Sequence, residues 1–411
     1  MNIGYLMQQA PEIRRPPYDG PASHVREVVS ELQRRGHQVR VLARIDEALW
    51  VSTDLSRFQP VAVRRLEVGP RRLTEKAVRR IQHQLRLPYL NWFESARFAG
   101  ACVQELSECD VLYERFSWVG YGGRLAARQL RRPLVIEYNG DPLHDLEAKG
   151  IAPAGIQKRL SVGLTRAALH GAAHIVASGV GWRRQAIDRW GLDPDRVSVV
   201  ENGTGLLRIV QREQLRAFEP EGADPREIGL VYLGGFLPWH GIAVLLRAFA
   251  RARGQGAPVR LSLIGAGEGV QEARKAVAAA GLNGNVVMTG ALSLDEYAPL
   301  LAAADIGLSP YCGWKEYAGL KLYDYKAAGL AVIASGEDGQ PSTLEHGRTG
   351  WIVPPCDEDA LTSAILRLAS DPALRRRLGR EARLEAERSH GWDQTASRLE
   401  AIFGQVTHHA S

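Results

Sequence analysis

Residues 314–335, which read WKEYAGLKLYDYKAAGLAVIAS, decide how this chain folds. A helical pattern over residues 322–328 stops at Gly329, and the apolar run 330–334 that follows predicts a buried strand. The helix is expected to begin near residues 319–320. Its free N–H groups and the positive end of its dipole then point into the preceding loop. A loop, a helix, a glycine stop and a strand are the repeating parts of an α/β fold.

Two carboxylates and a lysine flank the expected start of this helix. Glu316 precedes it, Asp324 lies in its first turns, and Lys321 lies between them. A phosphate fits beside Lys321 at the helix start, and each carboxylate could hold hydroxyl groups on one side of that phosphate. A nucleotide sugar has this shape. The alternative is that the carboxylates only complement the helix dipole, which is common near a helix start.

This arrangement resembles the donor-binding motif of family-4 retaining glycosyltransferases of GT-B fold. In that motif a second glutamate follows the first after seven residues. The resemblance implies that Glu316 contacts the transferred sugar and that Asp324, one methylene shorter than the usual glutamate, holds the ribose. The donor diphosphate is then expected at the residues between them: Ala318, Gly319, Leu320 and Lys321.

Short apolar runs alternate with helical patterns along the whole chain. We expect strands in the first half at residues 3–7, 38–43, 111–114, 134–138, 174–177 and 197–200. In the second half we expect them at residues 229–233, 259–264, 286–289, 305–309, 331–334 and 351–353. This alternation predicts an α/β fold with two doubly wound parallel sheets, whose ligands lie at the carboxyl ends of the strands. Two Rossmann-like domains facing a central cleft would form the GT-B fold.

A stretch rich in charge and proline, near residues 203–228, marks the expected domain boundary. The acceptor-binding domain would span residues 1–205 and the donor-binding domain residues 206–391. The last helical pattern, residues 392–411, begins at Trp392, and the resemblance implies that this helix packs back on the first domain. The alternative is a last helix packed on its own domain.

The loop after the first expected strand opens an amphipathic helix at residues 19–25, DGPASHV. It resembles the first βα unit of the family, where a glycine-containing loop faces the donor phosphates and the acceptor. Gly20 is therefore expected at the donor and His24 at the acceptor. The alternatives are that Ser23 is a helix N-cap and that His24 is a capped surface histidine.

Residues 137–141, EYNGD, end another strand of the first half. Asn139 stands where many relatives carry a histidine close to the transferred sugar, and its amide could hydrogen-bond sugar hydroxyls without acting as a base. Glu137 and His144 are expected at the acceptor, although a solvated charged loop is the alternative for residues 141–147. The turn-like ENGT at residues 201–204 predicts a structural turn.

Residues 234–241, GGFLPWHG, follow the first strand of the second half. Family members commonly have an arginine and a lysine there on the diphosphate, whereas this chain has Gly235 and His240 at the matching positions. Lys321 and His240 are expected to contact the diphosphate in place of that arginine and lysine. The glycines at 265–269 resemble a dinucleotide signal only superficially, because no acidic ribose partner follows. The resemblance instead places Thr289 and Ala291 beside the base.

The composition is that of an ordinary globular protein: 411 residues, 45% hydrophobic and 24% charged, with a net charge of +6. No apolar run approaches the roughly 20 residues of a membrane span. The four cysteines, Cys102, Cys109, Cys312 and Cys356, are interpreted as free thiols of a cytoplasmic protein. No basic strip interleaved with aromatics indicates nucleic acid. Residues 71–96 are basic and then aromatic, and could dock on the inner face of an anionic membrane; a solvated helix is the alternative.

These patterns favour a glycosyltransferase that moves a sugar from a nucleotide-diphosphate donor to an acceptor hydroxyl. Retention of configuration is implied by the resemblance. We expect no metal and no cofactor, and a carbohydrate, glycolipid or small natural product as the acceptor. One alternative is another nucleotide-sugar enzyme of the same scaffold, such as an epimerase or phosphorylase. A second is a non-catalytic nucleotide- or carbohydrate-binding module.

Overall fold

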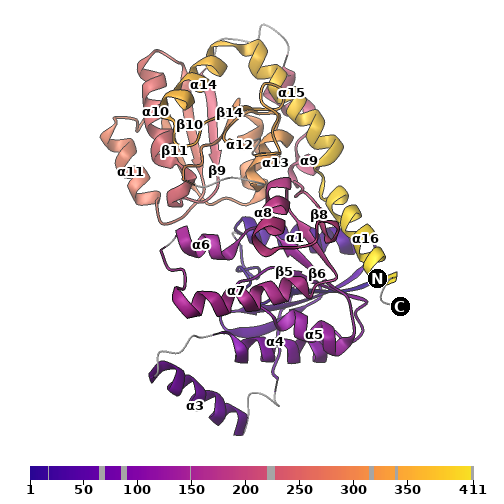
Figure 1. Cartoon of the computed structure of the whole chain (residues 1–411). Coiled ribbons are helices and arrows are strands. Elements are labelled where there is room, and N and C mark those ends of the chain that lie inside the picture. The colour runs from indigo at the N-terminus through magenta and orange to yellow at the C-terminus, as the bar shows by residue number, and fades with distance from the viewer. Residues whose placement is uncertain are drawn as a thin grey trace. The chain divides into compact units, whose positions relative to one another are not determined.

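The computed structural model describes residues 1–408 apart from residues 17 and 149 and the segments 64–69, 85–89, 220–226, 314–318 and 338–340. The chain divides into two compact units (Figure 1). Unit 1 comprises Met1–Val200 and Ala396–Ser411, and unit 2 comprises Glu201–Thr395. Each unit is described by itself.

Unit 1 is built on a sheet whose described strands run in the order β4-β3-β2-β1-β5-β6-β7-β8. These strands are β1 (Asn2–Met7), β2 (Gln38–Ile45), β3 (Ala48–Ser52), β4 (Gln59–Pro60), β5 (Val111–Arg115), β6 (Leu134–Tyr138), β7 (His174–Ala177) and β8 (Val197–Val199). The strands from β2 to β8 pair in parallel. The order of connection reverses between β1 and β5, which makes this a topological switch point, where α/β sheets bind ligands.

The strands β3 and β4 form an antiparallel edge that the sequence patterns did not predict. Asp46 and Glu47 join β2 to β3 in a two-residue turn, and both have positive φ, of 49° and 65°. A hairpin turn of this kind is usually announced by Asn-Gly or Asp-Gly. Because Asp-Glu is not such a signal, the sequence does not predict the β2–β3 hairpin.

The helices of unit 1 lie between these strands in the chain. They are α1 (Gly20–Arg34), α3 (Pro70–Gln84), α4 (Trp92–Glu105), α5 (Gly122–Leu130), α6 (Pro142–Ala148), α7 (Gly155–His170), α8 (Val180–Trp190) and most of α16 (Trp392–His408). Asp19, and not Ser23, caps α1, because its carboxylate accepts a hydrogen bond from the N–H of Ala22 at 2.8 Å. The predicted apolar face of α1 is buried.

Unit 2 contains a parallel sheet with strands in the order β11-β10-β9-β12-β13-β14. They are β9 (Ile228–Leu233), β10 (Val259–Ile264), β11 (Val286–Gly290), β12 (Ile306–Ser309), β13 (Ala331–Ser335) and β14 (Trp351–Val353). Counted along the unit, this is the Rossmann order 3-2-1-4-5-6, with its switch point between β9 and β12. The strands match the predicted runs closely, because strands covered on both faces read as continuous apolar sequence.

Helices cover both faces of this sheet. They are α9 (Leu206–Ile209), α10 (Ile242–Gly254), α11 (Val270–Ala279), α12 (Leu294–Ala302), α13 (Leu320–Ala327), α14 (Glu358–Ser370) and α15 (Pro372–Ser389). Successive strand residues join different apolar clusters: Leu230 packs with α10 and α14, whereas Val231 packs with α12 and α13. None of the helices within the described ranges is long and apolar enough to cross a membrane.

The boundary between the units runs through α16, whose residues from Ala396 onward group with unit 1. In that part of the helix, Glu400 pairs with His37 at 2.6 Å, and Phe403 packs edge-on against Tyr113. In unit 2, a Cβ on Gly203 would lie 2.6 Å from the backbone nitrogen of Trp392. Gly203 of the ENGT segment is therefore needed because two backbones approach closely there. The sequence analysis explained this glycine by a tight turn, and that explanation is wrong.

Candidate functional site

The helix α13 begins where the sequence predicts, at Leu320. Gly319 precedes it in an extended conformation and supplies no side-chain cap. Gly319 therefore gives the first N–H groups of this helix no capping side chain, and the N–H of Leu322 donates to the carbonyl of Gly319 at 3.0 Å. Glu316 and Ala318, two of the predicted site residues, lie outside the described residues.

Tyr325 fixes α13 against the sheet. Its ring covers Gly307 on β12, where a Cβ would lie 2.7 Å from the ring. Its hydroxyl donates to the carbonyl of Leu308 at 3.1 Å and accepts from the N–H of Leu233 at 2.7 Å. Tyr325, in the second half of α13, thereby holds the helix between β9 and β12, at the switch point of unit 2.

A buried lysine, Lys326, directly follows Tyr325 and fixes the C-terminal end of the same helix. The Nζ of Lys326 donates to Glu385 at 2.7 Å, to the carbonyl of Thr343 at 2.8 Å and to Nε2 of His390 at 3.0 Å. Burial lowers the pKa of Lys326, although Glu385 opposes this shift. Because a buried charge needs such partners, the network ties α13 to α15 and to the segment that leads into α16.

Lys321 lies in the first turn of α13 and is 8% exposed. Its Nζ donates to the hydroxyl of Tyr311 at 3.2 Å and lies 4.5 Å from the centre of that ring. The ring of Tyr232 is 5.3 Å away, and a Cβ on Gly234 would lie 3.4 Å from Nζ. Aromatic faces stabilise a cation through the negative potential of the ring.

Gly235 and His240 lie beside this lysine. The carbonyl of Gly235 accepts from the hydroxyl of Tyr232 and from Nδ1 of His240, each at 2.6 Å. Burial, and then the charge of Lys321, lower the pKa of His240 to about 4. The imidazole is therefore neutral at neutral pH. The carbonyl acceptor assigns its proton to Nδ1, so Lys321 is the cation of this group. We call Lys321, Tyr232, Gly235, His240 and Tyr311 the Lys321 cluster.

The glycines after β9 and β10 allow two loops to stack backbone against backbone. Gly265 has a φ of 142°, and a Cβ there would overlap the carbonyl oxygen of Gly234. A Cβ on Gly267, at φ 145°, would lie 2.8 Å from the nitrogen of Phe236. Glycine is therefore required by backbone packing and by positive φ at both positions.

Asp324 lies on α13 three residues after Lys321, which places both on one side of the helix. Its two carboxylate oxygens accept from the hydroxyl of Thr204 at 2.6 Å and from that of Tyr297 at 3.0 Å. Thr289 and Ala291 lie exposed at the carboxyl end of β11, where the hydroxyl of Thr289 donates to the carbonyl of Gly290. No contact among the described residues joins these two to the Lys321 cluster.

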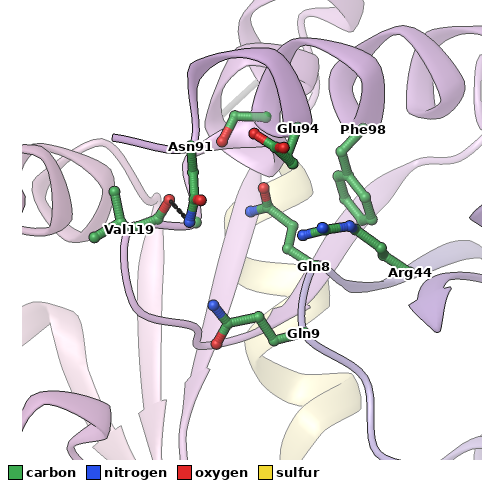
Figure 2. A pocket seen from close by; sticks show the side chains of 9 residues that line it. Gln8, Gln9, Arg44, Asn91, Glu94, Phe98 and Val119 are labelled. Atoms are coloured by element: carbon green, nitrogen blue, oxygen red, sulfur yellow. Dashed lines mark hydrogen bonds between the residues drawn. The ribbon is translucent and has the colours of Figure 1, made fainter. Parts of the chain in front are cut away.

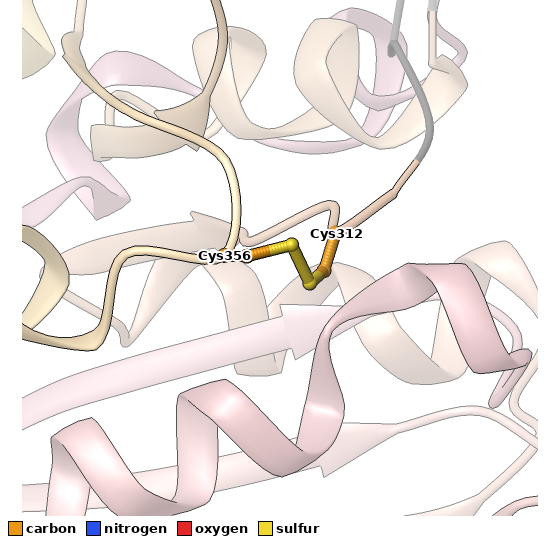
Figure 3. The surroundings of a disulfide bond; sticks show 2 residues. All are labelled: Cys312 and Cys356. Carbon is orange, nitrogen blue, oxygen red and sulfur yellow. A yellow bond between two sulfur atoms is a disulfide. The ribbon is translucent and has the colours of Figure 1, made fainter.

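A disulfide lies next to the Lys321 cluster and corrects the expectation of four free thiols. Cys312 and Cys356 are bonded, with their Cα atoms 4.7 Å apart (Figure 3). Cys102 and Cys109 are buried and free. The N–H of Cys312 also donates to the carbonyl of Trp239 at 2.9 Å. The loop after β12, which carries Tyr311, is thus tied at Cys312 to two other segments of unit 2.

In unit 1, a buried carboxylate gathers the end of β6 with its neighbours. Nε2 of His24 lies 2.5 Å from Glu137, and the hydroxyls of Tyr5 and Tyr113 each donate to the same carboxylate at 2.8 Å. Arg115 lies 3.8 Å away. Burial opposes ionisation, but His24, Arg115 and Tyr113 outweigh it and lower the pKa of Glu137 to about 2. His24 is therefore a buried partner of an ionised carboxylate, and the alternative of a surface histidine is wrong.

Two buried donor atoms near this carboxylate have no hydrogen-bond acceptor among the described residues. They are Nη1 of Arg115, at the end of β5, and Nδ2 of Asn139, just beyond β6. Gly20, the first residue of α1, lies one turn of that helix before His24. Most buried polar groups are hydrogen-bonded, so these two donors are exceptions among the described residues.

His144 is not part of this group in any described contact. It lies on α6, where its ring is 3.9 Å from Glu147 and its side chain is 43% exposed. The expectation of a solvated loop here is wrong, because residues 142–148 are helical and Asp141 is buried. The carboxylate of Asp141 lies 2.8 Å from Nε of Arg189.

The sequence patterns missed a polar pocket in unit 1 (Figure 2). Its lining residues are Gln8, Gln9, Arg44, Asn91, Glu94, Ser95, Phe98, Val119 and Gly120. Gln8 also donates to Glu114, whose pKa burial raises to about 8. Nothing in the sequence could have joined these segments, because the residues lie far apart and a polar residue at a strand end resembles a surface residue. Across the described ranges, no group of three or more histidine, cysteine or acidic side chains could hold a metal ion.

Two family models together match most of the chain. The model described as "Glycosyl transferase 4-like domain" matches residues 19–203, and the one described as "Glycosyl transferases group 1" matches residues 213–385. The D-inositol 3-phosphate glycosyltransferase of Pseudarthrobacter chlorophenolicus is 30% identical over 244 residues, which cover 58% of this chain and 57% of that protein. The MMP alpha-(1->4)-mannosyltransferase of Mycolicibacterium hassiacum is 27% identical over 56% of this chain and 61% of its own length. The chain thus matches little more than half the length of these relatives.

Solved structures show the same fold. The Anabaena protein HepE in complex with UDP superposes with a TM-score of 0.71 at 17% identity, covering 98% of this chain and 100% of that one. The sucrose-phosphate synthase of Thermosynechococcus elongatus superposes with a TM-score of 0.70 at 20% identity, and the match covers both chains fully. Two doubly wound α/β units with this topology define a protein of GT-B fold, as predicted. The chain belongs to the group 1 family of glycosyltransferases.

Proposed function

We propose that this protein transfers a sugar from a nucleotide-diphosphate donor to an acceptor hydroxyl, with retention of configuration and without a metal ion. The observation that carries the proposal is the position of Lys321. It lies in the first turn of α13 at the switch point of unit 2, against the glycines that follow β9. A lysine, the N-terminus of a helix and a close backbone together suit a diphosphate.

The Lys321 cluster would stabilise the leaving group. Negative charge develops on the diphosphate as the glycosidic bond breaks, and preorganised N–H groups and Lys321 can meet it without moving. His240 is neutral and fixed by Gly235, so it can contribute a hydrogen bond but no charge. This division of roles replaces the arginine–lysine pair that is common in the family.

The two carboxylates of the motif are proposed to hold the ends of the donor. Glu316 would contact the sugar. Asp324 already accepts from Thr204 and Tyr297, yet its oxygens have further lone pairs for a ribose hydroxyl. We propose that the leaving phosphate itself helps to deprotonate the acceptor, since Asn139 cannot serve as a base.

The relatives suggest the kind of acceptor. The names of the first of them specify D-inositol 3-phosphate, and that of another specifies a mannosyltransferase. We propose that the acceptor is a polyol or carbohydrate bound at the strand edge of unit 1, with His24, Glu137 and Asn139 close to its hydroxyl groups.

Residues 71–96 are proposed to touch an anionic membrane surface on its cytoplasmic side. The helix α3 exposes Leu73 at 69% and Ile81 at 50%, and Trp92 follows at 61%. Lys76 and Arg80 lie exposed on the same helix. Apolar side chains flanked by lysine and arginine bind anionic interfaces. Co-sedimentation with phosphatidylglycerol vesicles, compared with phosphatidylcholine vesicles, tests this contact.

Product analysis tests the proposed reaction. Purified protein is incubated with UDP- and GDP-sugars and with a panel of polyol acceptors, with and without EDTA. We expect transfer that EDTA does not reduce, and a product with the anomeric configuration of the donor. Activity lost in EDTA and restored by magnesium or manganese would contradict the metal-independent reaction. Interconversion of the donor without an acceptor would favour an epimerase.

A further inference from the structure

We infer that Tyr297 and Thr204 are positioning residues for the ribose of the donor: their hydroxyl groups orient the carboxylate of Asp324, which accepts from the ribose hydroxyls. The inference rests on the proposed function in taking Asp324 as the ribose-binding carboxylate. It goes further by naming two residues outside the motif at 316–324. These two residues would determine how strongly the protein prefers a ribonucleotide over a nucleotide whose sugar lacks the hydroxyls.

The two hydroxyl groups hold the two oxygens of the Asp324 carboxylate separately. Thr204 donates to one oxygen at 2.6 Å, and Tyr297 donates to the other at 3.0 Å. Because each oxygen has its own donor, the carboxylate cannot rotate about χ2 without losing a hydrogen bond. Both donors are neutral, so they leave the negative charge of the carboxylate in place. The carboxylate is therefore held in one orientation and keeps the charge that strengthens a hydrogen bond from a ligand hydroxyl.

The surroundings of Thr204 fix the direction in which its hydroxyl donates. The hydroxyl oxygen accepts from the N–H of Leu206 at 3.0 Å, and the N–H of Thr204 donates to the carbonyl of His390 at 2.9 Å. A hydroxyl group has one hydrogen. Since the N–H of Leu206 already points at the oxygen, that hydrogen is directed to Asp324.

Tyr297 is held in place by the packing of α12. Helices α9, α12 and α13 contribute to one apolar cluster of unit 2 (Figure 1), and the ring of Tyr297 packs against this cluster, which contains Leu206 and Leu322. A reciprocal capping box of Ser293 and Glu296 closes the first turn of α12. The ring is therefore placed by apolar contacts, and removal of its hydroxyl leaves those contacts intact.

The position of Asp324 suits the ribose of a donor whose diphosphate lies at Lys321. The two residues are three positions apart on one side of α13, which corresponds to about 4.5 Å of rise along the helix. The helix α12 follows β11, whose carboxyl end carries Thr289, the residue expected beside the base. One segment would thus contact the base at its beginning and hold the ribose carboxylate through Tyr297.

A purely structural role is the alternative for both hydroxyl groups. Asp324 is buried, and a buried carboxylate needs hydrogen bonds whether or not it binds a ligand. In a structural role, loss of the Tyr297 hydroxyl changes the affinity for all donor fragments alike or for none. In a positioning role, the loss changes the affinity only for fragments that carry ribose hydroxyls.

Calorimetric titration of the full chain separates these two roles. The probes are UDP, GDP, the 2′,3′-dideoxy form of each, and pyrophosphate. We expect the parent to bind one of the ribonucleotides at least about tenfold more tightly than its dideoxy form. Tyr297→Phe should lower this preference by about 3- to 10-fold, as the loss of one orienting hydrogen bond implies, and leave pyrophosphate unchanged. Thr204→Val should lower the preference in the same way, whereas Thr204→Ser keeps the hydroxyl and should retain it.

A double variant shows whether Tyr297 acts through Asp324. Asp324→Ala alone should abolish the preference for the ribonucleotide. Tyr297→Phe should then have no further effect on it, because the effects of residues that act through one contact are not additive. Tyr121→Phe is the matched control: it removes a hydroxyl that donates to the carbonyl of Leu90 in unit 1, and it should bind all probes as the parent does.

The outcomes separate the inference from the proposed function. If Asp324→Ala abolishes the preference while Tyr297→Phe and Thr204→Val retain it in full, the inference is overturned and the proposed function stands. A Tyr297→Phe variant that weakens pyrophosphate as much as the ribonucleotide has a structural role, which also overturns the inference. A parent that binds the ribonucleotide no more tightly than its dideoxy form overturns the inference and the ribose role of Asp324, but leaves sugar transfer, which product analysis measures. A parent that binds no probe and transfers no sugar contradicts both.

Discussion

Asp324 shows how one side chain is shared between structure and ligand. Its carboxylate holds Thr204 and Tyr297, and only a further hydrogen bond to a ribose would make it part of the donor site. The position could be predicted from the sequence, because it stands at a fixed spacing from Glu316 in a recognisable motif. Its two hydroxyl partners could not, since Thr204 lies 120 residues away in the chain.

Asp324→Ala should weaken the binding of a nucleoside diphosphate by about 1.5–3 kcal/mol, the range for hydrogen bonds to a charged group. It should leave pyrophosphate unaffected, because that ligand has no ribose. Asp324→Glu, the usual residue of the family, should bind both ligands. Calorimetric titration of the two ligands measures the difference. Equal affinity of the parent and Asp324→Ala for the nucleoside diphosphate would mean that this carboxylate serves only Thr204 and Tyr297.

The buried carboxyl group of Glu114 should make the stability of the protein depend on pH. Burial raises its pKa from 4.5 to about 8, against the opposing hydrogen bonds of Gln8 and Gly123. Between these values the folded protein keeps a proton that the unfolded chain has lost. The free energy of unfolding therefore falls as the pH rises from about 5 to about 8, by at most about 1.4 kcal/mol per pH unit.

Glu114→Gln should remove this contribution, because a neutral amide has no proton to lose. Urea unfolding at several pH values between 5.5 and 8 should then show a flatter dependence than in the parent. Glu108→Gln, at an exposed position near the start of the same strand, is the control and should leave the slope unchanged. The same slope in Glu114→Gln and the parent would show that Glu114 titrates normally.

At the scale of the elements, the parallel strands and α13 were predictable because each has a strong local signal. Continuous apolar runs mark strands buried on both faces, and Gly329, with φ 64°, marks the end of the helix. The hairpin β2–β3 lacks a turn signal, and the disulfide joins residues 44 positions apart. Contacts of that range depend on the tertiary fold and leave no trace in a single sequence.

The disulfide should stabilise the element that carries Tyr311. Cys312→Ser should lower the free energy of unfolding of the oxidised protein by about 2–4 kcal/mol, as closing a loop of this length implies. The same substitution should also weaken the binding of a nucleoside diphosphate, because Tyr311 contacts Lys321. Chemical unfolding and calorimetry, each with and without a dithiol reductant, measure both effects. Cys312→Ser should not respond further to the reductant, whereas Cys102→Ser, at a buried free thiol, keeps the disulfide and should lose stability on reduction as the parent does. Stability of the parent that is unchanged on verified reduction would contradict a stabilising role.

At the scale of the whole molecule, the two units divide the chemistry. Unit 2 presents a lysine, glycines and a helix start, whereas unit 1 presents a buried Glu137 group and a polar pocket. The fold and the two-sheet organisation followed from the alternation of strands and helices. The pocket in unit 1 could not be predicted from the sequence, because its residues come from four separate segments that meet only in the folded protein.

The central claim is that the start of α13 binds the donor diphosphate through Lys321. Calorimetry of a nucleoside diphosphate with the parent, Lys321→Ala and Lys275→Ala tests it most directly, since Lys275 is exposed on α11 of the same unit. The account predicts that Lys321→Ala loses about 1.5–3 kcal/mol of binding free energy, as expected for charge-assisted hydrogen bonds. Lys275→Ala should bind like the parent. An affinity of Lys321→Ala equal to that of the parent, in a variant with unchanged unfolding, would contradict the claim.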